Sequence, residues 1–131
     1  MHGLTELEVT KDILAVCILD SNSDIPVWAI SSTFYSITRT HEELSIVCIE
    51  DAVPCSVKSE KGWRSIKVQG VLDFSLVGIL SSIADPLAKA GISIFALSTY
   101  NTDYILVKQN VLANAVKVLE ARGFKVNSKN I

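Results

Sequence analysis

The stretch Gly91–Val107, GISIFALSTYNTDYILV, decides how this 131-residue chain folds. Each end of it is a run of β-branched, aromatic and other apolar residues, and such runs favour strands. Between the runs lie Ser, Thr and Asn, which bond to their own backbone and tolerate turns. The stretch therefore predicts a β-hairpin with a six-residue polar tip, Ser98–Asp103, and strands that meet near Tyr100 and Thr102.

A helix is predicted upstream of this hairpin and is ended by Gly91. Apolar residues recur at helical spacing over residues 76–90, which gives the helix one apolar face. Either Asp73 or Ser75 is able to cap its first turn. Pro86 lacks the backbone N–H that a helix interior uses, so it predicts either a kink or a restarted turn.

A second helix is predicted after the hairpin, from a cap at Asn110 to a stop at Gly123. Strands are predicted before the first helix and after the second, at Trp63–Val68 and Phe124–Val126. The second half of the chain thus reads strand, helix, strand, strand, helix, strand. The inner face of the second helix is predicted to carry Leu112, Ala115, Val116 and Leu119.

The first half of the chain is predicted to be mostly strand. Leu4–Val9 alternates apolar and polar residues and predicts a half-exposed strand, while Ile13–Leu19 is an apolar run typical of a buried one. Ile25–Ile30 leaves room for only a turn or so of helix. A second hairpin follows, with strands Thr33–Thr38 and Leu44–Ile49.

The two hairpins form an internal repeat. A shift of 60 positions places Phe34–Val47 over Ile94–Val107, with similar strands, a six-residue tip and an acidic residue at the same point. Equal spacing of this kind argues for two related lobes. We therefore expect an N-terminal lobe over residues 1–61 and a C-terminal lobe over residues 62–131.

The topology of the second half brings three segments to one edge of its sheet. The right-handed first crossover leaves the first two strands parallel, with the third strand between them. Residues 70–73, the helix start at 74–78 and the tip at 98–103 then fall together. A helix N-terminus favours a carboxylate, and Asp103 offers the opposite charge. An α-amino acid, which has one anionic and one cationic end, suits this edge.

Composition excludes several classes of function. The net charge is −2 and the 12 Lys and Arg residues are scattered, so neither nucleic acid nor an anionic membrane is an expected partner. No apolar run is long enough to span a bilayer, and the first residues lack the pattern of a leader. The three cysteines include no CxxC pair, which favours reduced thiols. We expect a cytoplasmic protein.

No catalytic motif is found in the sequence. There is no GxSxG elbow, no P-loop, no GxGxxG after a strand, and no His or Cys spacing typical of a metal site. Of the two histidines, His2 lies beside the first residue and His41 lies in a polar hairpin tip. We therefore expect a protein that is not an enzyme and uses neither a cofactor nor a metal.

Three segments resemble the ACT domain, a ferredoxin-like regulatory module that binds amino acids at interfaces between copies. They are Leu72–Leu80, Pro86–Ile94 and Leu97–Val107. The most similar version is that of the CASTOR-type arginine sensors and small bacterial tandem-ACT proteins. The resemblance is strong over Trp63–Val126 and weaker over the first half. It implies an α+β fold of two ferredoxin-like ACT (βαββαβ) lobes, of which the first is degenerate and has a reduced helix.

The resemblance also implies where a ligand binds. In the resembling sensors, contacts come from the turn before the first helix and from a Ser-Thr-aromatic-x-x-Asp tip. On this chain the corresponding ligand-binding residues are Val71, Leu72, Asp73, Ser75, Gly78, Ser98, Thr99, Tyr100 and Asp103.

Several of these residues have a structural role as the alternative. Ser98 and Thr99 would equally satisfy amides at the strand ends. Tyr100 fits an exposed or interface aromatic better than a stacking platform. Gly78 is explained as well by close packing of helix on sheet as by the approach of a ligand.

The expected function is that of a regulatory protein that binds a small amino acid and controls another protein. The resembling sensors pair several ACT units in one chain, whereas this chain has two, so a homodimer would complete the site. The alternative is a protein–protein interaction module that keeps the ACT fold without a small ligand.

Overall fold

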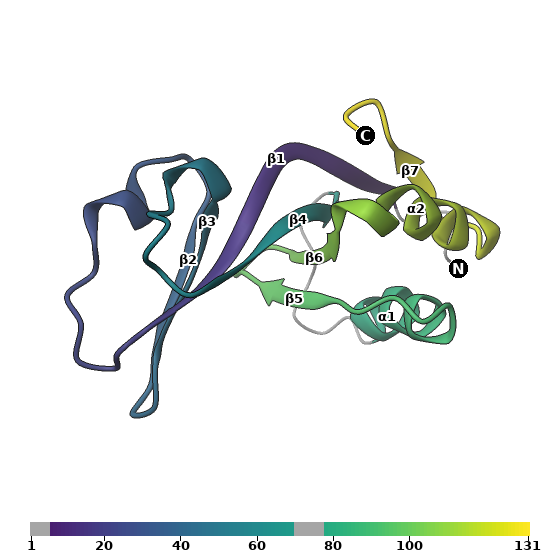
Figure 1. Ribbon diagram of the computed structural model, residues 1–131. Coiled ribbons are helices and arrows are strands. Elements are labelled where there is room, and N and C mark those ends of the chain that lie inside the picture. The colour runs from purple at the N-terminus through teal and green to yellow at the C-terminus, as the bar shows by residue number, and fades with distance from the viewer. Residues whose placement is uncertain (1–5, 70–77) are drawn as a thin grey trace. The chain divides into compact units, whose positions relative to one another are not determined.

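The computed structural model describes residues 6–69 and 78–131, which divide into two compact units. Unit 1 is the described part of residues 1–11 and 64–131, and unit 2 is residues 12–63 (Figure 1). The predicted halves, 1–61 and 62–131, differ from this division because the first strand contributes to both units. Two long strands, β1 (Glu6–Leu19) and β4 (Ser59–Val68), cross from one unit to the other.

Strand β1 replaces two predicted strands with one. Leu4–Val9 and Ile13–Leu19 were expected to be separate, and this prediction was wrong because the polar residues between them are extended as well. Thr10 is part of the strand, and its hydroxyl lies 2.6 Å from the hydroxyl of Ser65 on β4. Polar residues in the middle of β1 therefore support strand pairing instead of ending the strand.

Unit 1 contains the predicted strand–helix–strand–strand–helix–strand series. Its strands are ordered β7-β1-β4-β6-β5, and its helices are α1 (Ile79–Lys89) and α2 (Leu112–Ala121). The placement of β6 (Asp103–Lys108) between β4 and β5 (Phe95–Ser98) is as predicted. The start of β1, however, lies between β4 and the short β7 (Lys125–Asn127), to which it is paired in parallel.

Helix α1 has a different start from the predicted one and passes through its proline. It begins at Ile79 after Gly78, whose φ of 83° is left-handed, and it continues as one helix through the buried Pro86. The alternative of a restarted turn at Pro86 was therefore wrong. The predicted caps Asp73 and Ser75 lie outside the described residues.

Helix α2 is preceded by a 3₁₀ turn that the sequence pattern did not indicate. Asn110 lies inside this turn, η4 (Gln109–Val111), so its prediction as the cap was wrong. The amide of Leu112 instead bonds to the carbonyl of Gln109, and backbone takes the place of a capping side chain. The predicted inner face is confirmed, since Leu112, Ala115, Val116 and Leu119 are all buried.

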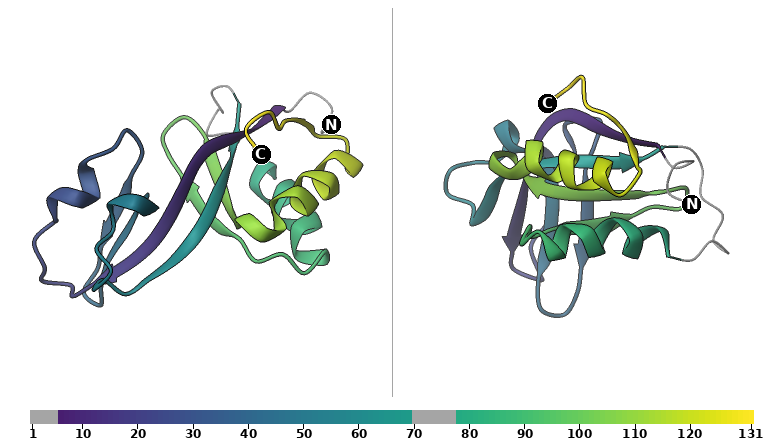
Figure 2. Two further views of the ribbon diagram at one scale, coloured as in Figure 1. Left: turned by 45° about the horizontal axis from the view of Figure 1, so that its top comes forward. Right: turned by 90° about the vertical axis from the view of Figure 1, so that its right-hand side faces the viewer.

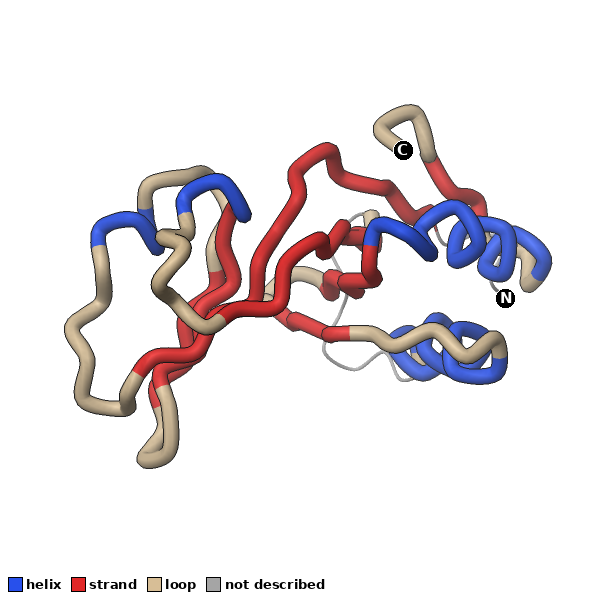
Figure 3. The backbone as a smooth tube through the Cα atoms, viewed as in Figure 1, coloured by secondary structure: helices blue, strands red, loops and turns tan. Residues whose placement is uncertain are grey.

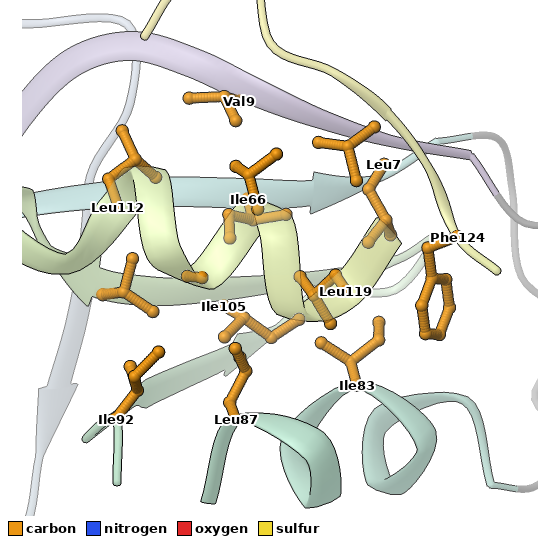
Figure 4. Close-up of a cluster of buried hydrophobic side chains, with 14 of the residues drawn as sticks. Leu7, Val9, Ile66, Ile83, Leu87, Ile92, Ile105, Leu112, Leu119 and Phe124 are labelled. Atoms are coloured by element: carbon orange, nitrogen blue, oxygen red, sulfur yellow. The ribbon is translucent and has the colours of Figure 1, made fainter. Parts of the chain in front are cut away.

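The core of unit 1 lies between its helices and its sheet (Figures 2 and 4). An ion pair links the helices on the outside, because the Asp85 carboxylate lies 3.1 Å from Lys89 Nζ and 3.9 Å from Arg122. The cluster contains, among its fully buried members, Leu7 and Val9 from β1, Ile66 and Val68 from β4, Ile83 and Leu87 from α1, and Leu119 from α2.

Unit 2 is mostly strand and loop, with only 3₁₀ turns (Figure 3). Its strands are ordered β2-β3-β1-β4, where β2 is Ser36–Arg39 and β3 is Leu44–Ile49. The turn η2 (Val27–Ile30) is the reduced helix expected here, and η3 (Glu50–Ala52) follows β3. Its separate core is formed by Ala15, Cys17, Ala29, Leu44, Ile46, Cys48 and Val53.

The two hairpins share a turn shorter than the predicted six-residue tip. In each hairpin the amide of a threonine bonds to a carbonyl three residues on, from Thr40 to Glu43 in unit 2 and from Thr99 to Thr102 in unit 1. The turns are therefore 59 residues apart and not 60. With this alignment Asp103 corresponds to Leu44, so the acidic residue is not a shared feature of the two tips.

Candidate functional site

The β5–β6 tip holds a carboxylate in a defined position. Ser98 is the last residue of β5 and Asp103 the first of β6, and the two are direct partners across the hairpin. The Ser98 hydroxyl donates to Asp103 Oδ1 at 2.6 Å. The Ser98 hydroxyl thus bonds to a carboxylate and not to an amide at the strand end, and its role as a ligand contact stays a prediction. Ser98 orients Asp103.

The turn between these two residues is stabilised by Thr99. Its amide donates to the carbonyl of Thr102 at 2.8 Å, and its hydroxyl accepts from the Thr102 amide at 3.3 Å. This is the structural role that was the alternative for Thr99. Tyr100, at the centre of the turn, is 81% exposed.

Thr102 is a residue of this edge that the sequence analysis missed. It is only 6% exposed, and its hydroxyl donates to the carbonyl of Val68, the last residue of β4, at 2.7 Å. The tip and the exit of β4 therefore meet at one edge of unit 1, as the crossover geometry predicts. The only sequence signal for this contact was the presence of a threonine in the turn, and threonine is too common in turns to indicate a long-range bond.

Gly78 lies at the start of α1, which is at the same edge of unit 1 (Figure 2). A Cβ placed on Gly78 meets no atom within 4 Å, so close packing of helix on sheet, one of the two readings of this glycine, was wrong. Its left-handed φ of 83° is the local reason for a glycine. The other predicted residues of this turn, Val71, Leu72, Asp73 and Ser75, lie outside the described residues.

The helix start contributes a positive partial charge to this edge. Gly78 has no side chain to accept from the amides of the first turn, and its carbonyl accepts from Ser82 at 2.8 Å, which begins the helical ladder. Amides of a first turn carry the positive end of the helix dipole. A carboxylate at Asp103 and a positive helix end thus belong to one edge of the sheet.

The two buried thiols, Cys17 and Cys48, do not add a nucleophile. Burial raises the pKa of Cys17 to about 11, with a further contribution from Cys48 beside it, and burial also raises the pKa of Cys48. Both thiols are therefore protonated at neutral pH and pack as small apolar groups. Cys55 is exposed in the loop that follows η3.

Neither a metal-binding cluster nor a membrane-spanning helix occurs in the described part of the chain. Within residues 6–69 and 78–131, no group of three or more His, Cys, Asp and Glu side chains is placed to hold a metal ion. In that same part of the chain, no helix is both long and apolar enough to cross a membrane.

Two family models match the chain. The ACT domain model matches residues 58–121, and a second model, described as an N-terminal domain, matches residues 12–56. The first match covers most of the second half of the chain, where the βαββαβ series lies. The second falls within unit 2.

A curated relative is the human protein named cytosolic arginine sensor for mTORC1 subunit 1. It is 39% identical over 61 residues, which are 46% of this chain and 18% of that protein. The bovine protein of the same name matches equally. The matched part of this chain thus spans about a fifth of the length of these relatives.

Solved structures cover nearly the whole chain. A crystallised protein from Agobacterium tumefaciens is 36% identical, with a TM-score of 0.90, over 95% of this chain and 93% of that one. The ligand-free regulatory subunit of aspartate kinase from Thermus thermophilus is 11% identical, with a TM-score of 0.60, over 91% of this chain and 97% of that one. The second likeness is one of fold alone. The ACT domain model and the arginine-sensor match make this chain an ACT-domain protein that is similar to the CASTOR-type sensors.

Proposed function

We propose that this chain is a regulatory protein that binds a small amino acid at the edge formed by the β5–β6 tip. In this proposal Asp103 binds the cationic group of the ligand, and the amides at the start of α1 bind its carboxylate. The observation that carries the proposal is the bond from Ser98 to Asp103, because it fixes a carboxylate before any ligand arrives.

Two further features support this assignment. Thr102 joins the tip to the end of β4, so the carboxylate belongs to a rigid edge. The residues proposed as ligand contacts from the turn before α1 are Val71, Leu72, Asp73, Ser75 and Gly78. A relative that matches part of this chain is named an arginine sensor, which makes arginine the first ligand to test.

The proposal includes a homodimer and a regulated protein partner. The relative named above is several times longer than the matched stretch, so it has room for further domains in one chain. A second copy would supply the other wall of the site here. In this proposal Tyr100, an exposed aromatic residue of the tip, contacts that copy.

The test is a thermal-shift and calorimetric screen of the native oligomer against the common amino acids, beginning with arginine. A ligand at 100 times its Kd stabilises the folded state by about 2.7 kcal/mol, which a melting curve detects easily. Asp103→Asn is expected to abolish the effect. The matched control is Asp24→Asn, which removes a carboxylate from an exposed loop of unit 2.

The proposal fails if no amino acid stabilises the confirmed native oligomer, or if Asp103→Asn binds as well as the unchanged chain. A size measurement with and without ligand tests the dimer separately. A chain that stays monomeric both without and with a bound amino acid would count against a site completed by the second copy.

A protein–protein interaction module is the second candidate, and one feature of unit 2 favours it. Four large apolar side chains around η2 are exposed, namely Ile25 (48%), Val27 (80%), Ile30 (47%) and Tyr35 (45%). Exposed apolar groups near one another in sequence are typical of contact surfaces. Pull-down of a stable complex that is lost in Val27→Asp, and is insensitive to amino acids and to Asp103→Asn, would support this function instead.

A further inference from the structure

Arg64 is a buried cation of unit 1 that the proposed amino-acid site does not use. It lies on β4, is only 6% exposed, and precedes by two residues Ile66, which belongs to the core of unit 1 (Figure 4). Alternate residues of a strand share a face, so Arg64 lies on the face that the helices cover. It is also roughly 13 Å along β4 from Val68, to which the hairpin tip bonds.

The guanidinium of Arg64 is only partly satisfied. Its Nη2 donates to the carbonyl of Thr10 at 3.0 Å and to the carbonyl of Asn130. Its Nε is buried and has no acceptor among residues 6–69 and 78–131, and the ion pairs described in unit 1, at Asp85 and at Glu6, do not include Arg64. Buried charges in proteins are normally paired, and buried N–H groups normally have acceptors. In the described part of the chain, Arg64 thus lacks both a counterion and one acceptor.

Nε and Nη2 together form one edge of this guanidinium. The N–H groups along such an edge are parallel and match two oxygens of a carboxylate or phosphate group. At present two neutral carbonyls accept from Nη2 alone. The Thr10 carbonyl belongs to β1, whereas the Asn130 carbonyl belongs to a turn outside the sheet. An oxyanion in place of the Asn130 carbonyl would accept from both nitrogens, through bonds roughly twice as strong as neutral ones.

The turn that carries Asn130 follows β7 and is formed by residues 128–131. It is closed by a bond from the amide of Ile131 to the carbonyl of Ser128 at 3.1 Å. Among the residues that the structure describes, the hydrogen bonds from this turn to β1 and β4 both come from Asn130. Its side chain donates to the carbonyl of Val9 at 3.3 Å, and its own carbonyl accepts from Arg64. A turn attached through one residue is released at a smaller cost than a paired strand.

The surroundings of Arg64 carry positive charge. Lys11 and Lys129 are the chain neighbours of the two residues whose carbonyls bond to Arg64, and both lysines are exposed. Asp12 is the acidic residue nearest to them in sequence. Adjacent residues of a strand point to opposite faces, so Asp12 and Lys11 do not share a face of β1. This surface therefore favours an anion, and it favours a doubly charged anion over a singly charged one.

We propose that Arg64 binds a phosphate group, either inorganic phosphate or the phosphate of a small ester, when the turn of residues 128–131 moves aside. Nε and Nη2 of Arg64 then donate to two phosphate oxygens, and Lys11 and Lys129 neutralise the remaining charge. Without the anion, the Asn130 carbonyl accepts from Nη2 in its place. The turn and the anion therefore compete for the same edge of Arg64.

The test is a titration of the full chain followed by the Nε–H resonances of its arginines in ¹H–¹⁵N correlation spectra. The probes are inorganic phosphate and glycerol 3-phosphate, with acetate as a singly charged oxyanion and sodium chloride as the control for ionic strength. We expect phosphate to shift the Nε–H resonance of Arg64 in a saturable manner and to leave those of Arg39 and Arg122 unchanged. Acetate is expected to bind at least about tenfold more weakly, since it brings less charge.

The two phosphate probes distinguish the source of the group. Equal affinities for inorganic phosphate and glycerol 3-phosphate would show that the phosphate group alone is recognised. An affinity at least about tenfold higher for the ester would show that the ligand is a larger phosphorylated molecule. Either result supports a phosphate site at Arg64.

Two variants are expected to change this affinity in opposite directions. Arg64→Lys keeps the charge but removes the two-point edge, so the affinity for phosphate should fall about tenfold or more. Asn130→Ala removes the bond to Val9 that holds the turn, so the open state is more populated and the affinity should rise about three- to tenfold. Arg39→Lys and Asn114→Ala are the matched controls and should leave the affinity unchanged. Arg39 also donates to two backbone carbonyls, and Asn114 is exposed on α2.

Four outcomes would overturn the proposal. The first is an Arg64 Nε–H resonance that phosphate does not shift, and the second is an equal shift by acetate at the same concentration. The third is an unchanged affinity in Asn130→Ala, which would mean that the turn does not compete. The fourth is loss of phosphate binding in Asp103→Asn, because the two sites are separate. The Arg64 resonance is measured in the unchanged chain, so the test does not depend on the folding of Arg64→Lys.

Discussion

The hydroxyl of Thr102 donates to the carbonyl of Val68 across 2.7 Å, between residues 34 positions apart in the chain. This buried bond joins the turn of the β5–β6 hairpin to the last residue of β4. Asp103, the next residue, takes its position from that contact and from its pairing with Ser98.

Replacing Thr102 with valine is expected to destabilise the protein by about 1–3 kcal/mol, because the shape is kept while a buried carbonyl loses its donor. Urea unfolding gives the free-energy change. Thr102→Ser keeps the hydroxyl and should cost less than Thr102→Val. A cost for Thr102→Ser as large as that for Thr102→Val would contradict a dominant role of the bond to Val68.

Replacing Ser98 with alanine is expected to weaken ligand binding while leaving the stability of the protein almost unchanged. Ser98 is exposed, so its loss should change the free energy of unfolding by no more than about 0.5 kcal/mol. The Asp103 carboxylate would lose its orienting donor, and affinity for the ligand should fall about three- to tenfold. Calorimetry measures this fall.

The control for Ser98 is Ser31→Ala, which removes an exposed serine bond to the carbonyl of Trp28 in unit 2. Ser31→Ala should leave the affinity for the ligand unchanged. Unaltered affinity in Ser98→Ala would mean that Asp103 needs no orientation by Ser98.

Gly78→Ala is expected to cost about 1–2 kcal/mol through backbone strain alone, because a residue with a Cβ disfavours a left-handed conformation. The space around Gly78 is open, so no steric clash adds to this cost. Gly78→Asn should cost less, since asparagine tolerates this conformation better. Chemical denaturation of both variants measures the difference, and a cost that is the same for Ala and Asn contradicts the strain explanation.

The buried Cys17 thiol is expected to make stability fall at alkaline pH. Its pKa is about 11 in the folded protein against an ordinary value of 9.0. The unfolded chain therefore loses this proton first, so the thiol's contribution is complete below pH 9 and is lost as pH rises toward 11. The full effect is about 2–3 kcal/mol.

Unfolding of the unchanged chain and of Cys17→Ala, measured from pH 8 to pH 11, tests this dependence. The difference between the two chains should shrink across that window by the amount attributed to Cys17. A difference that stays constant with pH would show that the thiol titrates as it does in the unfolded chain.

The sequence predicted the parts of the fold that depend on local pattern. The β5–β6 hairpin, the reduced helix at η2 and the buried face of α2 follow from the alternation or helical spacing of apolar residues. The end of α2 at Gly123 follows from a glycine with a φ of 94°. These features depend only on residues that are close together in the sequence, so a sequence pattern is enough to predict them.

The insertion of β1 between β4 and β7 was not predicted, because it depends on pairing across the whole chain. Leu7 is the partner of Val126, and no local pattern relates two residues so far apart. The cap of α2 was missed for a different reason. Asparagine is a good cap, yet a 3₁₀ turn containing Asn110 satisfies the helix start with backbone alone.

The candidate site was predicted in part. Ser98 and Asp103 are adjacent because a hairpin tip brings them together, and the pattern of strands around the tip was clear. Thr102 was missed because its role depends on a bond to a distant carbonyl.

The crossing of β1 and β4 from one unit to the other makes unit 2 an insertion within unit 1. The chain leaves unit 1 at Lys11 and returns at Arg64, on strands whose Thr10 and Ser65 hydroxyls are 2.6 Å apart. A two-residue turn is enough to connect strands at that separation. In the order of the chain, unit 2 therefore lies where a hairpin loop between Lys11 and Arg64 would lie.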